Sequence, residues 1–409
     1  MASRYSQLSR DELAVLVPEL LLIGHLIDRA GMAYALAEWG PDEMTQIAIE
    51  EWMAASPVYT KRMQRALQFE GDDVVTIFKG MQLEIGAPPQ FMDFRYWVNA
   101  DDPYHGGFHL DHCGALLDVE PMGDHMVKNM CHDIEDPTFD ATAVATNPKA
   151  RMRPIHRPPR TPSDQHPHCA WTVDIDSSSE DTQPSPHLAV IAALKVGSLD
   201  LDPIDHAEPG ATDYSGDLVS DIDFAGFAHS ALARIADEVA IQQHLLNLSF
   251  VHAVRARAKD DDQFQRVVRN QLIGHSGMAA ERLARAFGLM GTPQDAALVL
   301  ALHPVMNPAA YVDFTRDGAT VTVSRSAAHD DGAWVSLIDP EHPEALQAIV
   351  RGVNACLDVE ITGDADSWTA RIVETATPAP EAEAVQLTKF SRGATFEFQT
   401  RKTLPLFVV

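Results

Sequence analysis

The chain has 409 residues, which is enough for two domains of ordinary size, each with its own core. Hydrophobic residues make up 45% of it and charged residues 22%, the proportions of a globular protein and not of a disordered or fibrous one. The formal net charge is −28, and so acidic a surface repels phosphate backbones and anionic lipid. We therefore expect a small-molecule substrate and neither nucleic acid nor a membrane as partner, while assembly into a homo-oligomer stays open.

The N-terminal sequence and the cysteines predict a cytoplasmic protein. Residues 1–5 lack the basic, then apolar, then small-residue order of a signal peptide. The longest apolar stretch, residues 13–27, is interrupted by Pro18, Glu19 and His25 and is too short to span a bilayer. The 4 cysteines have irregular spacing and form no disulfide framework, so we interpret them as core thiols, ligands or nucleophiles.

Residues 9–80 are predicted to be helical. Apolar residues recur at helical spacing through 13–36 and 44–67, and Gly40-Pro41-Asp42 separates the two blocks. The Gly/Pro-rich segment 86–89 ends the helical part, and residues 91–98 have the composition of a strand.

The same order of predicted elements returns after residue 217. Helical blocks are predicted at 222–257 and 261–288, and a strand at 311–314. At an offset of 220, identical residues recur in pairs that include Arg62/Arg282, Arg65/Arg285, Ala66/Ala286, Gly71/Gly291, Pro88/Pro308, Asp93/Asp313 and Phe94/Phe314. Segments 129–135 and 354–360 share the pattern Asn-x-Cys-x-Asp-x-Glu, and Trp171-Thr172 resembles Trp368-Thr369.

These repeats predict an α+β fold made of two tandem, diverged copies of one unit of helices and antiparallel sheet. A pseudo-twofold axis would relate the copies, as in a homodimer fused into one chain. The expected boundaries are 1–185 for the first copy, 186–216 for a linker, 217–378 for a second, degenerate copy and 379–409 for C-terminal strands.

The first copy is predicted to carry an insertion. Glu135 and Trp171 are 36 positions apart, whereas Glu360 and Trp368 are 8 apart, which predicts 28 extra residues within 136–170. Residues 148–160 contain five cationic side chains and four prolines, typical of an extended, irregular loop. Two interpretations stay open: a solvated connector, or a lid whose Arg157 or Arg160 binds an anionic group of the substrate.

Histidines and cysteines concentrate in the first copy. Eight of the 18 histidines lie within 105–168, and three of the 4 cysteines lie within 113–169. If residues 108–113 form a strand, alternation places His109, Asp111 and Cys113 on one face. Imidazole and thiolate suit zinc, and two histidines with a carboxylate suit ferrous iron.

The first functional hypothesis is a metal-dependent hydrolase or lyase, with zinc or non-haem iron, acting on a small anionic organic molecule. Its predicted metal ligands are His109, Cys113, His168 and Cys169. Its predicted catalytic residues are Asp111, Cys113, Cys131 and His132, and its predicted substrate-binding residues are Arg157 and Arg160.

Three alternatives stay open, because no Cys-x-x-Cys pair or His-Glu-x-x-His helix occurs in the sequence. The first is a cysteine-nucleophile hydrolase without metal, which requires a lowered thiol pKa. The second is a non-haem iron oxygenase that uses His109, Asp111 and a distant histidine such as His166 or His168. The third is a non-enzymatic metal or redox sensor. The second copy keeps His329 and Asp331, and the sequence does not decide whether it has a site of its own.

His25 lies in the first helical block and matches His244 at an offset of 219. A single histidine on an apolar helical face is typical of a core or interface residue, and this is the interpretation we give it. Trp52 is interpreted as helix packing.

A series of short motifs in residues 10–175 resembles a known family. A helix ending in Arg65-Ala66-Leu67 precedes a Gly71-Asp72 pair, and Cys113, Cys131 and Cys169-Ala170-Trp171 follow. This order resembles bacterial proteins grouped with L-2-amino-thiazoline-4-carboxylic acid hydrolase. The resemblance implies a cytoplasmic α+β fold with cysteine-centred chemistry that opens a C–N or C=N bond, with Cys113, Cys131 and Cys169 as the residues that carry over. The many histidines and the repeat depart from that pattern.

Overall fold

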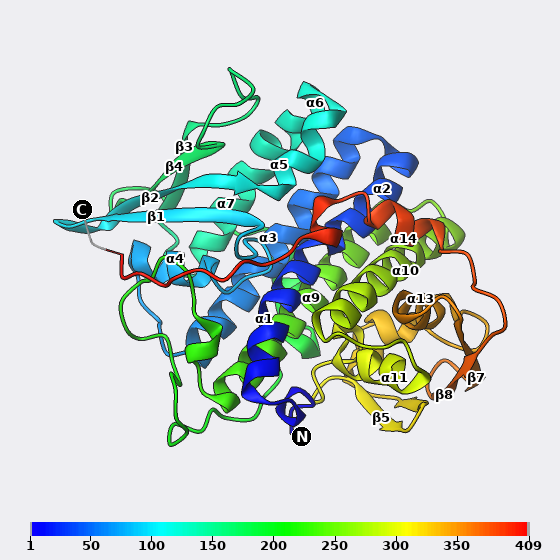
Figure 1. Cartoon of the computed structure of the whole chain (residues 1–409). Helices are drawn as coiled ribbons and strands as arrows, with labels where there is room; N and C mark the ends of the chain where they lie inside the picture. Colours follow the sequence, from blue (N-terminus) through cyan, green and yellow to red (C-terminus); the bar gives the residue numbers. More distant parts are fainter. Residues whose placement is uncertain (1, 407–409) are drawn as a thin grey trace.

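A computed structural model describes residues 2–406 as a mixed α+β protein with two four-stranded antiparallel sheets. The sheets lie at opposite ends of the molecule, with the long helices between them (Figure 1). The α+β class predicted from the sequence is confirmed.

The first half begins with four helices: α1 (Arg10–His25), α2 (Ile27–Trp39), α3 (Pro41–Ala66) and α4 (Val74–Met81). Ser9 and Glu12 form a capping box that satisfies backbone N–H groups at the start of α1. Gly40, with φ of 84°, allows the sharp turn before α3, and Pro41 occupies the first helical position, where no N–H is needed. The helices predicted over residues 9–80 are confirmed.

The first sheet has the order β1-β2-β4-β3, built from β1 (Met92–Asn99), β2 (Asp102–Cys113), β3 (Ala150–His156) and β4 (Cys169–Ile175). Its inner face carries Phe94, Phe108 and Trp171, which stack edge-to-face or face-to-face. A helical segment connects β2 to β3, and it consists of α5 (Gly114–Val119), η2 (Glu120–Met122), α6 (Asp124–Lys128), the π-helix η3 (Asn129–Ile134) and α7 (Glu135–Val144).

The second half has elements of the same kind in the same order. Its helices are α9 (His229–Arg257), α10 (Asp261–Ala286) and α11 (Pro293–Leu302). Its sheet has the order β5-β6-β8-β7, built from β5 (Asp313–Asp317), β6 (Thr320–Ser324), β7 (Leu357–Gly363) and β8 (Trp368–Glu374), with α12 (Ala327–Asp330) and α13 (Glu344–Val353) between β6 and β7. Helices α3 and α10 each contain 26 residues, and they start 220 positions apart.

The helices of both halves pack together around one large apolar core and a smaller apolar cluster between α2, α3, α9 and α10. Helix α9 packs against α1 and α3, and α10 packs against α2. Within residues 2–406, no helix combines the length and the apolar character that crossing a lipid bilayer requires.

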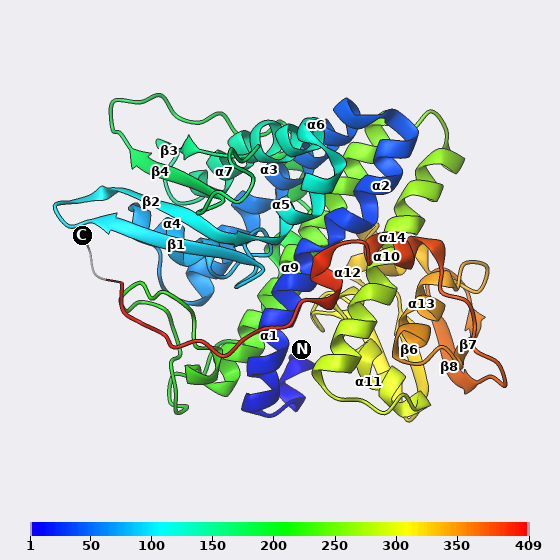
Figure 2. The same cartoon turned by 45° about the horizontal axis from the view of Figure 1, so that its top comes forward.

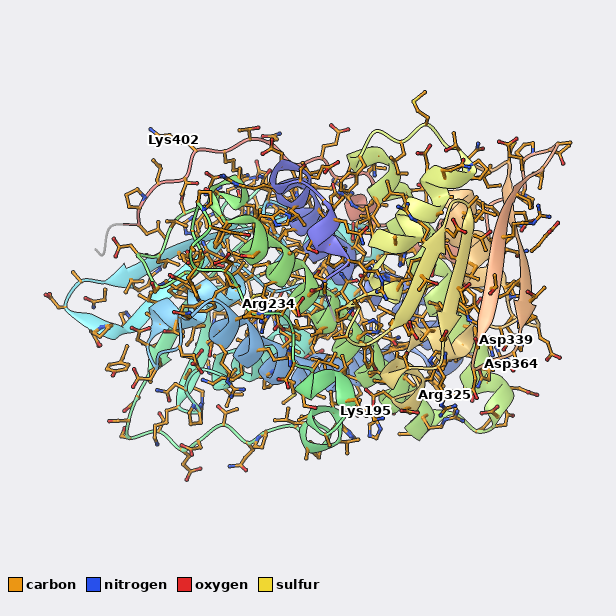
Figure 3. All side chains as sticks on the ribbon, turned by 90° about the horizontal axis from the view of Figure 1, so that it is seen from below. Lys195, Arg234, Arg325, Asp339, Asp364 and Lys402 are labelled. Atoms are coloured by element: carbon orange, nitrogen blue, oxygen red, sulfur yellow. The ribbon has the colours of Figure 1, made fainter. Side chains whose placement is uncertain are left out.

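Two connecting segments run along the surface. The segment between the halves forms α8 (Leu188–Ala192) and η4 (Lys195–Ser198), and Lys195 bonds to Asp330, which also pairs with Arg325. Figure 3 shows Lys195 and Arg325 near each other at one edge of the second half. The C-terminal segment forms α14 (Glu383–Thr388) and η8 (Arg392–Thr395) and then extends along the first half, where Arg401 pairs with Asp93 (Figure 2, red).

Three expectations from the sequence are wrong in detail. Residues 379–406 form helices and extended chain, with one isolated β-bridge between Val219 and Pro405, and not the predicted strands; residues 407–409 lie outside the described part. Residues 150–156 form the edge strand β3, which tolerates Pro154 because its outer side needs no donor. The segment 129–135 is helical whereas 357–363 is a strand, so their shared motif does not mark equivalent positions.

Candidate active site

The first half encloses a cavity of about 240 Å³ between α2, α3, β1 and the helical segment 114–144. Leu387, Phe390 and Ser391 of the C-terminal segment complete its wall. Most of the lining is apolar, and it includes seven of the chain's 14 methionines, namely Met32, Met44, Met81, Met92, Met122, Met126 and Met130. Because methionine side chains are flexible and polarisable, such a wall adapts to ligands of different shape.

A break between two helices brings polar side chains to this cavity. Helix α1 ends at His25 and α2 begins at Ile27, so the helical hydrogen-bonding pattern is interrupted at Leu26. Residues on both sides of the break, His25, Asp28 and Arg29, line the cavity. Helix α9 passes through the matching region of the second half as one uninterrupted helix of 29 residues.

Four side chains of the cavity wall form what we call the buried polar cluster: His25, Asp28, Tyr59 and Glu84. All four are buried, and each has at least one polar atom without a hydrogen-bond partner in the protein. For His25 these are both ring nitrogens, and for Glu84 the atom is Oε2. These four residues carry five unpartnered buried polar atoms in the wall of one cavity, and such atoms are candidates for hydrogen bonds to a ligand or to water.

Burial determines which members of the cluster carry protons. Burial lowers the pKa of His25 to about 3, and the nearby Arg29 adds to the effect, so the imidazole is neutral. Burial raises the pKa of Glu84 to about 8, against a smaller lowering by the Thr60 hydroxyl. Burial, together with Glu84 and Asp28, raises the pKa of Tyr59 well above its ordinary value. At neutral pH, Glu84 and Tyr59 are therefore proton donors.

A second carboxyl group, that of Glu51, lies beside Asp28 and does not line the cavity. Glu51 is completely buried, and burial followed by the adjacent Asp28 raises its pKa well above the ordinary value. Oδ2 of Asp28 accepts a hydrogen bond of 2.8 Å from Trp52 Nε1, and Oδ1 of Asp28 remains unpartnered. The raised pKa of Glu51 favours its protonated form, so a neutral carboxyl group lies beside Asp28.

Arg29 and Asp118 connect the cavity to the C-terminal segment. Arg29 Nε lies 3.3 Å from Asp118 Oδ2, and Asp118 also accepts hydrogen bonds from the Ser391 hydroxyl and from the backbone N–H of Arg392. Nη2 of Arg29 has no partner. The segment that carries Phe390 is therefore attached to the same ion pair that lines the cavity.

The three cysteines of the first half are buried near Glu135, which lines the cavity. Burial, with a contribution from Glu135, raises the pKa of Cys113 to about 12 and raises the pKa values of Cys131 and Cys169 well above the ordinary value. Cys113 Sγ accepts a hydrogen bond of 3.4 Å from the N–H of Leu116 at the start of α5. This environment favours the thiol over the thiolate that nucleophilic attack or metal ligation needs.

The structure does not place His109, Asp111 and Cys113 on one face of the strand, as the sequence predicted. Strand alternation holds up to Asp111: Leu110 is buried in the core, while His109 is partly exposed and Asp111 is exposed, and their Nε2 and Oδ1 atoms lie 3.2 Å apart. The pairing of β1 with β2 shifts between Met92 and Phe94, and Cys113 at the end of β2 is buried. His109 and Asp111 therefore lie on the outer face of the sheet, and the thiol lies in the core.

Three of the other predicted site residues have partners within the protein, whereas Nδ1 of the buried His168 has none. His132 Nε2 lies 2.6 Å from the carbonyl oxygen of Pro158. Arg160 makes two hydrogen bonds of 2.8 Å to Glu120, and Arg157 pairs with Asp136. His168 is buried beside His166 and His112, and burial lowers its pKa to about 4.

None of the nine predicted site residues lines the cavity. Among the residues that the structure describes, 2–406, no group of three His, Cys, Asp or Glu side chains has an arrangement suited to a metal ion, so the four predicted ligands do not form a ligand group.

The sequence analysis missed the buried polar cluster, because it interpreted His25 as a core residue and gave Tyr59 and Glu84 no role. One signal was available: Glu84 stands between Leu83 and Ile85, directly after a helical apolar segment, where a carboxyl group is costly.

Comparison of the chain with protein-family models, with curated proteins and with solved structures gave no match. The resemblance to the L-2-amino-thiazoline-4-carboxylic acid hydrolase group therefore stays a prediction.

Proposed function

We propose that the first half binds a small molecule with a mainly apolar body in the 240 Å³ cavity and transforms it by proton transfer, as a hydrolase or lyase. The observation that supports this proposal is the buried polar cluster, in which His25, Tyr59 and Glu84 present unpartnered atoms to an apolar cavity. A concave apolar site with a few convergent polar groups of shifted pKa is typical of an active site.

The buried polar cluster contains both a proton donor and a proton acceptor. Glu84 carries a proton that a leaving or carbonyl group can receive, because burial raises its pKa to about 8. Asp28 offers the unpartnered Oδ1, an oxygen that can accept a proton from the substrate. Tyr59 lies near both carboxyl groups and can stabilise a developing negative charge by donating its O–H.

The size of the cavity limits the substrate. A volume of about 240 Å³ lies just below the usual range of small-molecule pockets, roughly 300–1,000 Å³, so we expect a compact ligand. Arg157 and Arg160, predicted to bind an anionic group, are each occupied by a carboxylate, and Arg29 is the cationic side chain that reaches the cavity wall.

The zinc- or iron-dependent hydrolase or lyase inferred from the sequence stays a prediction. Elemental analysis of the purified protein and of a His109→Ala/Cys113→Ser variant tests it. About one metal ion per chain that is lost in the variant supports a metal site, and an unchanged metal content in the two proteins contradicts it.

We also infer that the two halves arose by duplication of one unit and that only the first kept the cavity. The inference is supported by the equal strand orders of the two sheets and by the equal lengths of α3 and α10 at an offset of 220. Arg62 of α3 and Arg282 of α10, a pair from that offset, each bind a buried glutamate of the other half, Glu238 and Glu19. This reciprocal arrangement is what a pseudo-twofold axis between the halves produces.

A pair of variants on α2 tests the proposed binding function. Ala33 lines the cavity, whereas Ala37 is exposed on the same helix. We expect fragments of about 8–12 non-hydrogen atoms to raise the melting temperature of the wild type, the Ala33→Phe variant to lose this response, and the Ala37→Phe variant to keep it. Equal responses of the two variants would place binding elsewhere and contradict the proposal.

A further inference from the structure

Carboxyl groups outnumber cations around the cavity. Asp28, Glu84, Asp118 and Glu135 line it, and Arg29 is the one cationic side chain in the lining. The charge of Arg29 is offset by Asp118 at 3.3 Å. Within residues 2–406, Asp28 and Glu84 have no arginine or lysine at ion-pair distance, so the buried polar cluster contains hydrogen-bond acceptors without a compensating positive charge.

The rest of the lining suits a positive charge as well as an apolar body. Trp52, Tyr59 and Phe94 place aromatic rings in the wall of the same cavity. The faces of aromatic rings attract cations, and this attraction is stronger when water is excluded. The methionine thioethers add polarisable atoms that pack against apolar groups.

We propose that the ligand of this cavity is an organic cation, a protonated amine on a compact aromatic or aliphatic body, whose ammonium group lies among Asp28, Tyr59 and Glu84. The proposal rests on the proposed function, because it takes the same cavity as the ligand site; with an ammonium group bound, Glu84 is a carboxylate and Tyr59 is the proton donor that remains in the cluster. The unpartnered Oδ1 of Asp28 and Oε2 of Glu84 would accept hydrogen bonds from the ammonium N–H groups, and the aromatic and methionine side chains would cover the apolar body.

Binding of such a cation has a defined proton balance. Glu84 lies near Tyr59 and Thr60 of α3 and Tyr96 of β1, and none of these side chains brings a positive charge to it. An ammonium group would be the first cation beside Glu84, and it favours the carboxylate. The O–H bond of Glu84 then breaks and its proton passes to the solvent, so uptake of the cation releases up to one proton per chain near neutral pH.

Calorimetric titration of the full-length protein tests this with three probes of equal shape: 2-phenylethylamine, 2-phenylethanol and phenylacetate. We expect the amine to bind at least about tenfold more tightly than the alcohol, and the alcohol more tightly than the carboxylate. Titrations at pH 7 in buffers of different ionisation enthalpy should show proton release for the amine alone. An affinity of the alcohol or of the carboxylate equal to that of the amine would overturn the proposal.

Two variants relate the result to the site. Glu84→Gln should weaken amine binding about tenfold and abolish proton release. Asp237→Asn is the matched control, because Asp237 is also buried, with burial raising its pKa to about 7, but it does not line the cavity; its amine binding should equal that of the wild type. Circular dichroism confirms that both variants are folded, and equal amine binding by the two would overturn the role of Glu84.

The outcomes separate this proposal from the proposed function. If all three probes bind equally and Ala33→Phe blocks them, the cavity is a ligand site and the preference for a cation is wrong. If none of the probes binds, the preference for a cation is also wrong, and the fragment screen with the α2 variants then decides on the function.

Discussion

His25 and His244, which the sequence pairs at an offset of 219, have different surroundings. His244 Nε2 lies 2.8 Å from the carbonyl oxygen of Asn307 and 3.2 Å from that of Pro304, and its ring packs against Tyr311 and Trp334 at 4.9 Å. Both nitrogens of His25 lack partners, and its ring lies beside Phe91 and the cavity. The same residue type is thus part of a closed interior in one half and part of an open site in the other.

Aromatic rings fill the interior of the second half around His244. His275 stacks on Trp334 at 4.9 Å and lies 5.7 Å from the ring of His303. The uninterrupted helix α9 runs through this region, whereas the first half has the break at Leu26 and a cavity lined by methionines. The two halves differ in the helix break at Leu26 and in the aromatic rings that fill the space around His244. We infer that these two differences, more than the histidine itself, account for the cavity in the first half.

The largest expected difference between the halves concerns their thiols. Because burial raises the pKa of Cys113 to about 12, its thiolate fraction at pH 8 is roughly a thousandfold below that of a thiol with an ordinary pKa. We expect one thiol, the partly exposed Cys356 of the second half, to react readily with Ellman's reagent in the native protein, and four to react in urea. The Cys356→Ser variant is the control, and a fast thiol remaining in it would contradict buried, inert cysteines and support a cysteine nucleophile.

Replacing each of the matched histidines by leucine should affect stability unequally. His244→Leu leaves the carbonyl groups of Asn307 and Pro304 without a donor, and we expect a loss of about 2–3 kcal/mol in the free energy of unfolding. His25→Leu breaks no hydrogen bond and removes two unpartnered nitrogens, so its effect should stay within about 1 kcal/mol. Urea denaturation measures both, and equal losses would mean that the two environments are alike.

The Glu84 carboxyl should make stability depend on pH. Its pKa rises from 4.5 to about 8 on folding, so between these values the folded protein holds a proton that the unfolded chain has released. The contribution of Glu84 to stability is therefore complete below about pH 4.5 and declines as the pH rises to about 8.

A Glu84→Gln variant should not show this decline, because glutamine does not ionise. Its free energy of unfolding should exceed that of the wild type by an amount that grows between pH 5 and pH 8 and reaches on the order of 1–3 kcal/mol. The difference is measured by denaturation at several pH values. A constant difference across this range would show that Glu84 ionises normally in the folded protein.

The smallest effect is expected at the exposed residues that the sequence analysis placed in the site. Asp111→Asn removes a surface contact with His109, and the free energy of unfolding should change by less than about 0.5 kcal/mol. Its response to cavity fragments in a thermal-shift assay should equal that of the wild type. Loss of the fragment response in this variant alone would indicate that the ligand binds at the outer face of the sheet and not in the cavity.

Local signals in the sequence predicted much of the fold. The apolar spacing of 44–67 and the Gly40-Pro41 boundary predicted α3, and the helical pattern of 261–288 predicted α10. These features depend on neighbours within a few positions, which a single sequence displays. The edge strand β3 was missed because its prolines and arginines are typical of a loop, and only pairing with β4 makes the segment a strand.

The candidate site was not predictable in the same way. His25, Tyr59 and Glu84 come from three parts of the chain and meet only because α1, α3 and the segment after α4 pack together. The cysteines and histidines of 105–169 are close in the sequence, but the bend at the end of β2 sends Cys113 into the core and leaves His109 on the surface. These residues were predicted to form one cluster because they are close in the sequence, but packing of the fold places them apart.

The central claim is that the cavity of the first half is the ligand site, and methionine methyl NMR tests it most directly. Seven of the 14 methionines line the cavity, while others, such as Met278 and Met306, lie in the core of the second half. Addition of 2-phenylethylamine to protein labelled with ¹³C at the methionine methyl groups should shift the signals of the lining methionines and leave Met278 and Met306 unchanged. Shifts at Met278 and Met306, or no shift at any lining methionine, would contradict the account.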